Sequence, residues 1–415
     1  MNATLFKNVH VLDVRAGQLL EDHQVLVEGD AIRELSDRPI TATTARVIDG
    51  GGRTLMPGLI DCHVHVTFSQ TNLGLLAQTP QTTLALRALP ILRGMLRRGF
   101  TTVRDAGGAD WALKQAIDDG IDGTVTGPRL FVSGPALSPT GGHGDFRPRS
   151  DRLQPIGCGC QRLASTRVVD GVDAVRRAVR ELLQMGADQI KIMSSGGVAS
   201  PTDPVNALGY SLEETRAIVD EAAARHTIVL AHAYTPEAIR RAVECGVRSI
   251  EHGNLIDAPT AALMAERGAF AVPTLITYEA LARDGARLGL GAESVAKIEQ
   301  VRAAGLKSLE ILKTAGVRMA FGTDLLGASH GLQSEEFLIR AQVQSNLEVL
   351  QSATLIGAEL LNQVGVIGEI AAGARADLLL VDGNPLADLA CLTGQGERIP
   401  LVMQGGKLRV NELRA

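Results

Sequence analysis

Residues 172–194 read VDAVRRAVRELLQMGADQIKIMS, an amphipathic segment followed by a short apolar one. In the first part, apolar residues recur at the three- and four-residue spacing of a helix, so we expect a helix over 172–187. The apolar run that follows, 189–194, is typical of a buried strand. A helix leading into a buried strand is the repeating unit of an α/β fold with a parallel sheet.

The same alternation continues on both sides of this stretch. The next predicted helix, 211–226, opens with Ser211 and has Glu214 three residues later, which is the pattern of a capping box. Eight strands are predicted between the chain ends, at 59–66, 101–106, 129–134, 189–194, 227–233, 249–253, 270–274 and 317–323. Eight strands alternating with helices favour a (β/α)₈ TIM barrel, which we expect to form one domain over residues 58–366.

The two ends of the chain have a different pattern. Both contain short alternating runs broken by Gly and Asp, such as HQVLVEG at 23–29 and KLRVN at 407–411. We therefore expect residues 1–57 and 367–415 to pair with each other in a small β-sandwich domain beside the barrel.

The composition restricts the partners that we expect. Lys and Arg number 41 and Asp and Glu number 46, a formal net charge of −5, which disfavours a nucleic-acid partner. No apolar stretch approaches the ~20 residues of a membrane span, so no membrane partner is expected. The first residues lack the basic and apolar regions of a secretion signal, which favours a cytoplasmic location.

The five cysteines do not form a recognisable framework. They are Cys62, Cys158, Cys160, Cys245 and Cys391. Their odd number and scattered spacing argue against a set of disulfides. The one close pair, Cys158 and Cys160, is interpreted as part of a loop or substrate pocket in preference to a zinc site.

The first predicted barrel strand carries two histidines, His63 and His65, in the order His-Val-His. Alternate residues of a strand share a face, so both imidazoles point the same way. Two imidazoles on one face suit Zn²⁺ or a similar ion. The alternative is a histidine pair that is hydrogen-bonded to the backbone.

The fourth predicted strand carries Lys191 within the apolar run QIKIM. Burial of a bare ammonium group is costly, so this lysine needs a special setting. One interpretation is an ion pair with a buried carboxylate. The other is a carbamate formed with CO₂, an anionic oxygen ligand able to bridge two metals.

Three more potential ligands follow apolar strands, namely His232 in VLAHAY, His252 in SIEHGN and Asp324 in FGTD. Catalytic groups of TIM barrels lie at the carboxyl ends of the strands, where all three are expected. With the earlier residues, they would hold two cations that share a water and lower its pKa. Asp324 is placed to take the proton of that water and to deliver it to a leaving amine.

In their order along the chain, several motifs resemble those of the amidohydrolase superfamily. They are PGLIDCHVH, GFTTVRDAGG, QIKIMSSGGV, VLAHAYT, SIEHGN, FGTD and GARADLLLVDG. The sequence is most similar to the prolidase-like branch related to imidazolonepropionases. That branch includes Xaa-Pro dipeptidases, enzymes that resemble arginine carboxypeptidases, and ochratoxin-hydrolysing amidohydrolases.

The resemblance implies a role for each candidate ligand. His63, His65 and Asp324 would bind one metal, and His232 and His252 would bind the second. Lys191 would be carboxylated and would bridge the two ions, which are expected to be Zn²⁺ because the ligands are nitrogen and oxygen atoms.

The resemblance also points to substrate contacts. His143 in GGHGD and Tyr234 in AHAY are candidates for catalysis and substrate binding, since both side chains can donate to a carboxylate or an oxyanion. Ser69 is expected to line the pocket. Arg104 and Asp105, which follow the second strand, are interpreted as a structural ion pair.

These expectations favour a binuclear amidohydrolase that cleaves dipeptides or N-acyl amino acids, including ochratoxin-type N-acyl-phenylalanine, as small-molecule substrates. A homo-oligomer is expected because superfamily members often assemble. The alternatives are a hydrolase of cyclic amides, similar to imidazolonepropionase, and a non-catalytic scaffold.

Overall fold

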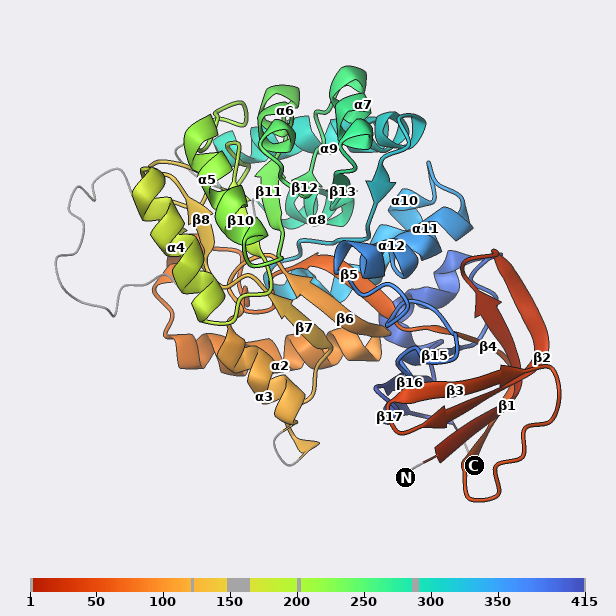
Figure 1. Cartoon of the computed structure of the whole chain (residues 1–415). Coiled ribbons are helices and arrows are strands. Elements are labelled where there is room, and N and C mark those ends of the chain that lie inside the picture. The colour runs from red at the N-terminus through yellow and green to blue at the C-terminus, as the bar shows by residue number, and fades with distance from the viewer. Residues whose placement is uncertain are drawn as a thin grey trace.

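The structure is a computed structural model that describes residues 3–120, 123–147, 165–199, 203–285, 290 and 292–413. Its strands form two parallel sheets in the central part of the chain and one mixed sheet made by the chain ends. Figure 1 shows the helices gathered around the parallel strands, with the mixed sheet at one end of the molecule.

The larger parallel sheet has seven strands in the order β14-β13-β12-β11-β10-β8-β9, and the smaller has the order β5-β6-β7. Their bounds are β5 Leu59–Val64, β6 Phe100–Asp105, β7 Arg129–Val132, β8 Ala136–Ser138, β9 Thr166–Val168, β10 Ile190–Met193, β11 Val229–Ala233, β12 Ser249–His252, β13 Phe270–Val272 and β14 Arg318–Met319. Each of the eight predicted strands overlaps one of these, and β8 and β9 are additional.

Backbone hydrogen bonds join the two parallel sheets. The amide of Cys62 in β5 donates to the carbonyl of Phe321, which follows β14, at 2.7 Å. At the other edge of the small sheet, the amide of Asp188, just before β10, donates to Val132 of β7 at 2.8 Å. The three-stranded sheet is therefore bonded to the seven-stranded one along both of its edges.

Helices cover one face of the parallel strands. The helices are α1 Leu73–Ala77, α2 Gln81–Arg97, α3 Trp111–Asp119, α4 Val172–Gln184, α5 Leu212–Ala223, α6 Pro236–Glu244, α7 Ala258–Glu266, α8 Leu275–Asp284, α9 Ala292–Thr314, α10 Glu336–Arg340, α11 Asn346–Ser352 and α12 Leu355–Leu360, with 3₁₀ segments η3 Gly327–Glu335, η4 Leu389–Leu392 and η5 Gly394–Gly396. The predicted capping box of Ser211 and Glu214 opens α5. Among the described helices, none combines the length and apolar character that a membrane crossing needs.

Alternate residues of the parallel strands pack against the helices. Ile192 of β10, Ala231 of β11 and Ile250 of β12 belong to one buried apolar cluster with residues of α4, α5 and α6. Because successive strand residues point to opposite faces, Lys191 and His232 point away from these helices, toward the other face of the sheet. Apolar packing on one face thus directs the candidate ligands to the other.

The chain ends pair in a seven-stranded sheet of order β17-β16-β15-β4-β1-β2-β3. Its strands are β1 Ala3–Asp13, β2 Gln18–Glu28, β3 Ala31–Ser36, β4 Arg46–Pro57, β15 Leu378–Val381, β16 Leu401–Gln404 and β17 Lys407–Asn411. β4 pairs in parallel with β1 and antiparallel with β15, so it connects the two ends of the chain. In Figure 1, the red β1–β4 accordingly lie beside the blue β15–β17.

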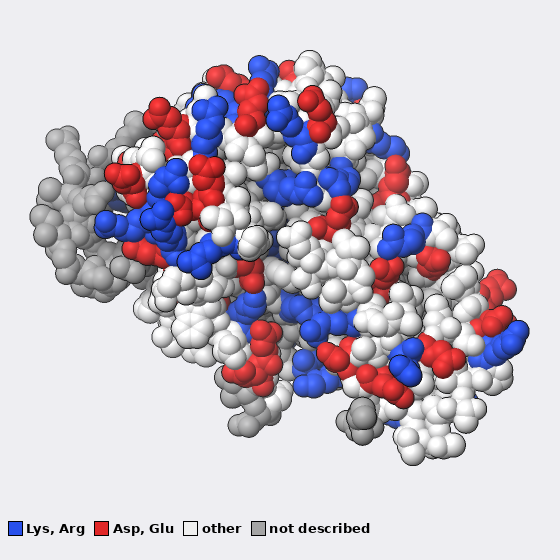
Figure 2. Space-filling view, in the orientation of Figure 1, with Lys and Arg blue, Asp and Glu red and all other residues white. Residues whose placement is uncertain are grey.

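Charges of both signs are interspersed on the face that Figure 2 shows. Some of them form pairs between neighbouring helices, as Glu221 of α5 does with Arg176 and Arg180 of α4 at 2.8 and 2.6 Å. Cys62, Cys245 and Cys391 are buried free thiols. Cys158 and Cys160 lie outside the described residues.

Candidate metal centre

The two histidines of β5 meet the carboxylate that follows β14. One ligand atom each from His63, His65 and Asp324 lie within 4.8 Å of one another. Nε2 of His63 lies 3.5 Å, and Nε2 of His65 3.2 Å, from Oδ1 of Asp324. The predicted grouping of these three residues is present in the structure.

The other ring nitrogens of these histidines are already occupied. Nδ1 of His63 donates to Oε2 of Glu251 at 2.6 Å, and Nδ1 of His65 donates to the carbonyl of Gly107 at 2.7 Å. Nε2 of His63 is buried and has no hydrogen-bond partner within the described chain. Burial and the nearby Lys191 hold the pKa of His63 well below its ordinary value, so its imidazole is neutral. A buried, neutral imidazole whose free nitrogen faces a carboxylate fits a divalent cation.

The backbone is unusual at two of the candidate ligands. Asp324 has φ of 52° and His252 has φ of 73°, in the left-handed region that residues other than glycine rarely adopt. The amide of Asp324 donates to the carbonyl of His63 at 2.8 Å, which holds this turn against β5. Such backbone strain is typical of functional sites, and here it directs the carboxylate toward the two histidines.

His252 and His232 extend the cluster along the strand ends. The ring centroids of His63 and His252 are 5.0 Å apart, and those of His252 and His232 are 4.7 Å apart. Nδ1 of His252 lies 2.8 Å from Oγ1 of Thr274, and Nε2 of His232 donates to the carbonyl of Gly196 at 3.1 Å. One nitrogen on each ring is left available, and burial holds the pKa of both rings well below the ordinary value.

Lys191 of β10 is also buried, with 2 % of its surface exposed. Within the described residues, its Nζ makes no hydrogen bond or ion pair, so the alternative of a pairing with a buried carboxylate is not supported. Burial lowers the pKa of Lys191 to about 8, although Glu251 and Asp324 act to raise it. Its charge in turn lowers the pKa of His63, His232 and His252, as expected for neighbours in one site.

A buried ion pair contacts Nδ1 of His63, the ring nitrogen that does not face Asp324. Arg104 and Glu251 are both fully buried, and Nη2 of Arg104 contacts the two carboxylate oxygens of Glu251 at 2.8 and 3.0 Å. The predicted ion pair of Arg104 with Asp105 is therefore wrong. Neighbouring strand residues point to opposite faces, and Asp105 instead accepts backbone amides, including that of Val66 at 2.8 Å.

His143 lies over the second pair of histidines. Its ring stacks on that of His232 with centroids 4.3 Å apart, and its Nδ1 lies 3.7 Å from Oδ2 of Asp203. A Cβ at Gly197 would overlap the imidazole of His143, so only glycine leaves room for the ring. Burial and Lys191 lower the pKa of His143 to about 4, which keeps it neutral.

Tyr234 is buried beside the same histidines. Its ring centroid lies 4.7 Å from that of His232 and 5.4 Å from that of His252. The hydroxyl of Tyr278 donates to the hydroxyl of Tyr234 at 3.0 Å. Both candidate substrate contacts, His143 and Tyr234, thus lie against the proposed ligands.

Ser69 directly follows Phe68, whose ring lies against the candidate metal centre. The ring of Phe68 stacks on that of His65 at 4.4 Å, and His330 donates from Nε2 to the carbonyl of Phe68 at 3.1 Å. Oγ of Ser69 is buried without a hydrogen-bond partner in the described part of the chain. Its role as a pocket residue stays a prediction.

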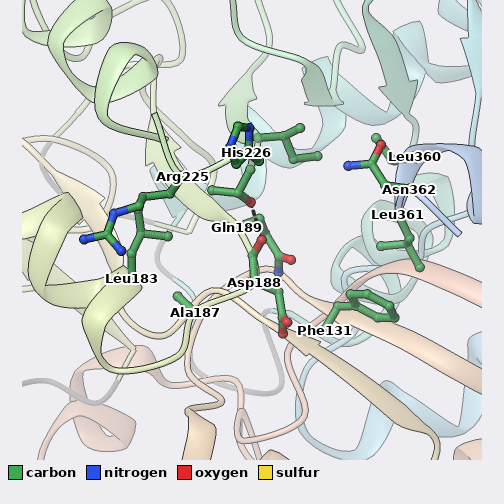
Figure 3. Close-up of a pocket in the computed structure, with 12 residues that line it drawn as sticks. Phe131, Leu183, Ala187, Asp188, Gln189, Arg225, His226, Leu360, Leu361 and Asn362 are labelled. Carbon is green, nitrogen blue, oxygen red and sulfur yellow. Dashed lines mark hydrogen bonds between the residues drawn. The ribbon is translucent and has the colours of Figure 1, made fainter. Parts of the chain in front are cut away.

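A cavity of about 360 Å³ has none of the candidate ligands in its lining. Figure 3 shows the residues that line it. Arg225, His226 and Asn362 are among the residues that line it. Its other lining residues include those that directly precede β10 and β11, so it lies at the amino ends of these strands. TIM-barrel catalysis takes place at the carboxyl ends, and we do not assign this cavity to the candidate site.

Converging imidazoles and a carboxylate at the ends of parallel strands are typical of metal-dependent hydrolases. The sequence profile of the amidohydrolase family matches residues 54–408. The chain belongs to the amidohydrolase family and is a hydrolase of amide bonds, as the motifs predicted.

Individual relatives agree with this assignment. The chain is 34% identical to the ochratoxinase of Aspergillus niger over 366 residues, which cover 85% of this chain and 75% of the relative. A crystal structure of an amidohydrolase is 60% identical, with full coverage of both chains and a TM-score of 0.97. A crystal structure of a prolidase in complex with N-methylphosphonate-L-proline is 57% identical, covering 98% of this chain and 99% of that one with a TM-score of 0.95.

Proposed function

We propose that the chain is a binuclear metallohydrolase that cleaves the amide bond of dipeptides or N-acyl amino acids. The observation that carries the proposal is the convergence of the Nε2 atoms of His63 and His65 on the carboxylate of Asp324. The names of its relatives, an ochratoxinase and a prolidase, support substrates in which an acyl group is joined to an amino acid.

Six side chains would hold two divalent cations, Zn²⁺ in our proposal. His63, His65 and Asp324 would bind the first ion, and His232 and His252 the second. Lys191 would hold both as a carbamate: its neutral amine attacks CO₂, a nitrogen–carbon bond forms as one carbon–oxygen π bond opens, and the nitrogen releases one proton to water. Its burial and its lack of an ion pair within the described residues support this step, because both favour the neutral amine.

Bound cations would supply an activated water and would polarise the carbonyl of the scissile bond. Asp324 accepts a proton from the water as the oxygen of the water bonds to the carbonyl carbon. The carboxylate then passes the proton to the amide nitrogen as the carbon–nitrogen bond breaks. The products are a carboxylic acid and a free amino acid.

His143 and Tyr234 are the proposed substrate contacts. Both are neutral donors in a buried setting, because burial lowers the pKa of His143 to about 4 and raises that of Tyr234 above its ordinary value. Donors of this kind bind a substrate carboxylate or an oxyanion strongly when water is excluded. Ser69 is proposed to line the same pocket.

We also propose the architecture predicted from the sequence, a closed (β/α)₈ barrel over 58–366 with a β-sandwich from 1–57 and 367–415. The backbone hydrogen bonds between β5 and Phe321 and between β7 and Asp188 support closure. The pairing of β4 with both β1 and β15 supports a separate terminal unit.

A substrate library assayed with the zinc-loaded protein tests the proposed activity. The library contains Xaa-Pro and other dipeptides, N-acyl amino acids including N-acyl-phenylalanine, and cyclic amides. Release of a free amino acid from the linear compounds is the expected result. Turnover of cyclic amides alone would favour the imidazolonepropionase-like alternative, and a zinc-loaded protein that hydrolyses none of these compounds would contradict the proposal.

A further inference from the structure

Two hydroxyl groups from the start of α8 connect a proposed metal ligand to a proposed substrate contact. Thr274 is the residue before α8, and Tyr278 lies one helical turn later. Residues four apart in a helix lie on the same face, so these two side chains are neighbours. Thr274 is 0 % and Tyr278 1 % exposed, so water does not compete for their hydrogen bonds.

The hydrogen bonds run in one direction from His252. Its Nδ1 lies 2.8 Å from Oγ1 of Thr274, and a ring that uses Nε2 as a ligand must carry its proton on Nδ1 and donate it. The hydroxyl of Thr274 is then free to donate, and the phenol of Tyr278 lies one helical turn further along α8. Tyr278 donates to Tyr234 at 3.0 Å.

Tyr234 lies at the end of this chain of donors. Its oxygen accepts from Tyr278, so its own hydrogen must point elsewhere. No other described residue accepts that hydrogen, and its ring lies 4.7 Å from His232, next to the proposed metal centre. Burial raises the pKa of both phenols above their ordinary value, so each keeps its proton at neutral pH.

We propose that Thr274 and Tyr278 are positioning residues that turn the hydroxyl hydrogen of Tyr234 toward an anionic oxygen of the substrate. The inference rests on the proposed function. It adds the residues that fix the direction in which the hydroxyl of Tyr234 donates its hydrogen. A phenol that accepts one hydrogen bond becomes a stronger and better directed donor of the next. The acceptor is either the carboxylate of the departing amino acid or the oxyanion that develops at the scissile carbonyl.

Tyrosine-to-phenylalanine variants test the proposal with little change in packing. Tyr278→Phe removes only the donor to Tyr234, and Thr274→Val removes the hydroxyl that precedes it. The matched control is Tyr210→Phe, because Tyr210 is also buried and its hydroxyl has no hydrogen-bond partner among the described residues. Zinc content and melting temperature are measured for every variant.

The readouts are kcat and KM for the best linear substrate, and the affinity for N-methylphosphonate-L-proline by calorimetry. We expect Tyr278→Phe to weaken binding or catalysis about tenfold, because the hydrogen bond that Tyr234 donates to the charged oxygen loses its fixed direction. A higher KM identifies the carboxylate as the acceptor, since it is present in the ground state, and a lower kcat identifies the oxyanion. The effect should vanish when Tyr234 is already phenylalanine, because Tyr278 acts only through it.

Wild-type behaviour of Tyr278→Phe, or an equal penalty with and without Tyr234, would overturn the inference while leaving the proposed function intact. A wild-type protein that neither binds the phosphonate nor hydrolyses any library compound would overturn both.

Discussion

Oε2 of Glu251 lies 2.6 Å from Nδ1 of His63, and the same carboxylate is held by the buried guanidinium of Arg104. This contact fixes which nitrogen of His63 faces Asp324. It also makes the imidazole a better electron donor toward a cation.

Glu251→Gln should therefore weaken metal binding without changing the shape of the site. We expect the zinc affinity to fall roughly 10- to 100-fold, as for other carboxylates that hold a ligand histidine. Competition with a chelator measures it. Glu412→Gln, which alters an exposed pair with Arg97, is the control and should keep the wild-type affinity. Equal affinities for the two variants would show that Glu251 does not tune His63.

Gly197→Ala should impair substrate use by displacing His143. The added methyl group would overlap the imidazole, which stacks on His232 and has little room to move. We expect a loss of about tenfold or more in kcat/KM with the zinc content unchanged, because His143 is not a proposed ligand. In the control, Gly74→Ala, the new Cβ meets only Oδ1 of Asn72 at 3.5 Å. Full activity of Gly197→Ala would count against a role for His143.

Asp324→Asn should abolish most of the activity even when zinc is saturating. The amide cannot accept the proton of the attacking water, and loss of a general acid–base group costs roughly 10²- to 10⁴-fold in rate. The measurement is kcat at zinc concentrations that restore the wild-type metal content. Retention of wild-type kcat would exclude Asp324 as the proton carrier.

His330 should make the fold sensitive to acid. Burial lowers the pKa of His330 to about 4 from an ordinary value of 6.5, so the unfolded chain binds its proton first as the pH falls. The stabilisation by neutral His330 is complete above pH 6.5 and is lost between pH 6.5 and 4, by about 3 kcal/mol in the free energy of unfolding.

Denaturant unfolding at several pH values checks this effect. His330→Asn should flatten the decline in stability between pH 6.5 and 4, relative to wild type. His226→Asn is the control, since His226 is exposed and its φ of 56° is one that asparagine tolerates. Parallel curves for wild type and His330→Asn would show that another group causes the acid sensitivity.

The sequence predicted the parts of the molecule that local patterns determine. Eight of the strands between β5 and β14 were found because apolar periodicity is a property of a short window. The ligand candidates were found because His63, Lys191 and His232 stand within or directly after such strands. β8 and β9 were not predicted, and β8 lies between Pro135 and Pro139, residues that are typical of loops.

The supporting residues escaped prediction because their partners are distant in the sequence. Glu251 lies 188 positions from His63, and Tyr278 lies 44 positions from Tyr234. No local pattern in the segments SIEHGN or LITYEAL predicts these contacts, although Glu251 directly precedes a predicted ligand. Arg104 was assigned to its neighbour Asp105 for the same reason, since only the fold places Glu251 opposite it.

The number of metal ions per chain shows whether the six proposed ligand side chains form a binuclear centre. Inductively coupled plasma mass spectrometry of the purified, zinc-loaded protein should find two zinc ions per wild-type chain. Lys191→Met, which keeps the side-chain length but cannot react with CO₂, should retain one ion at most. A wild-type chain without bound zinc, or a Lys191→Met chain that still holds two ions, would contradict the account.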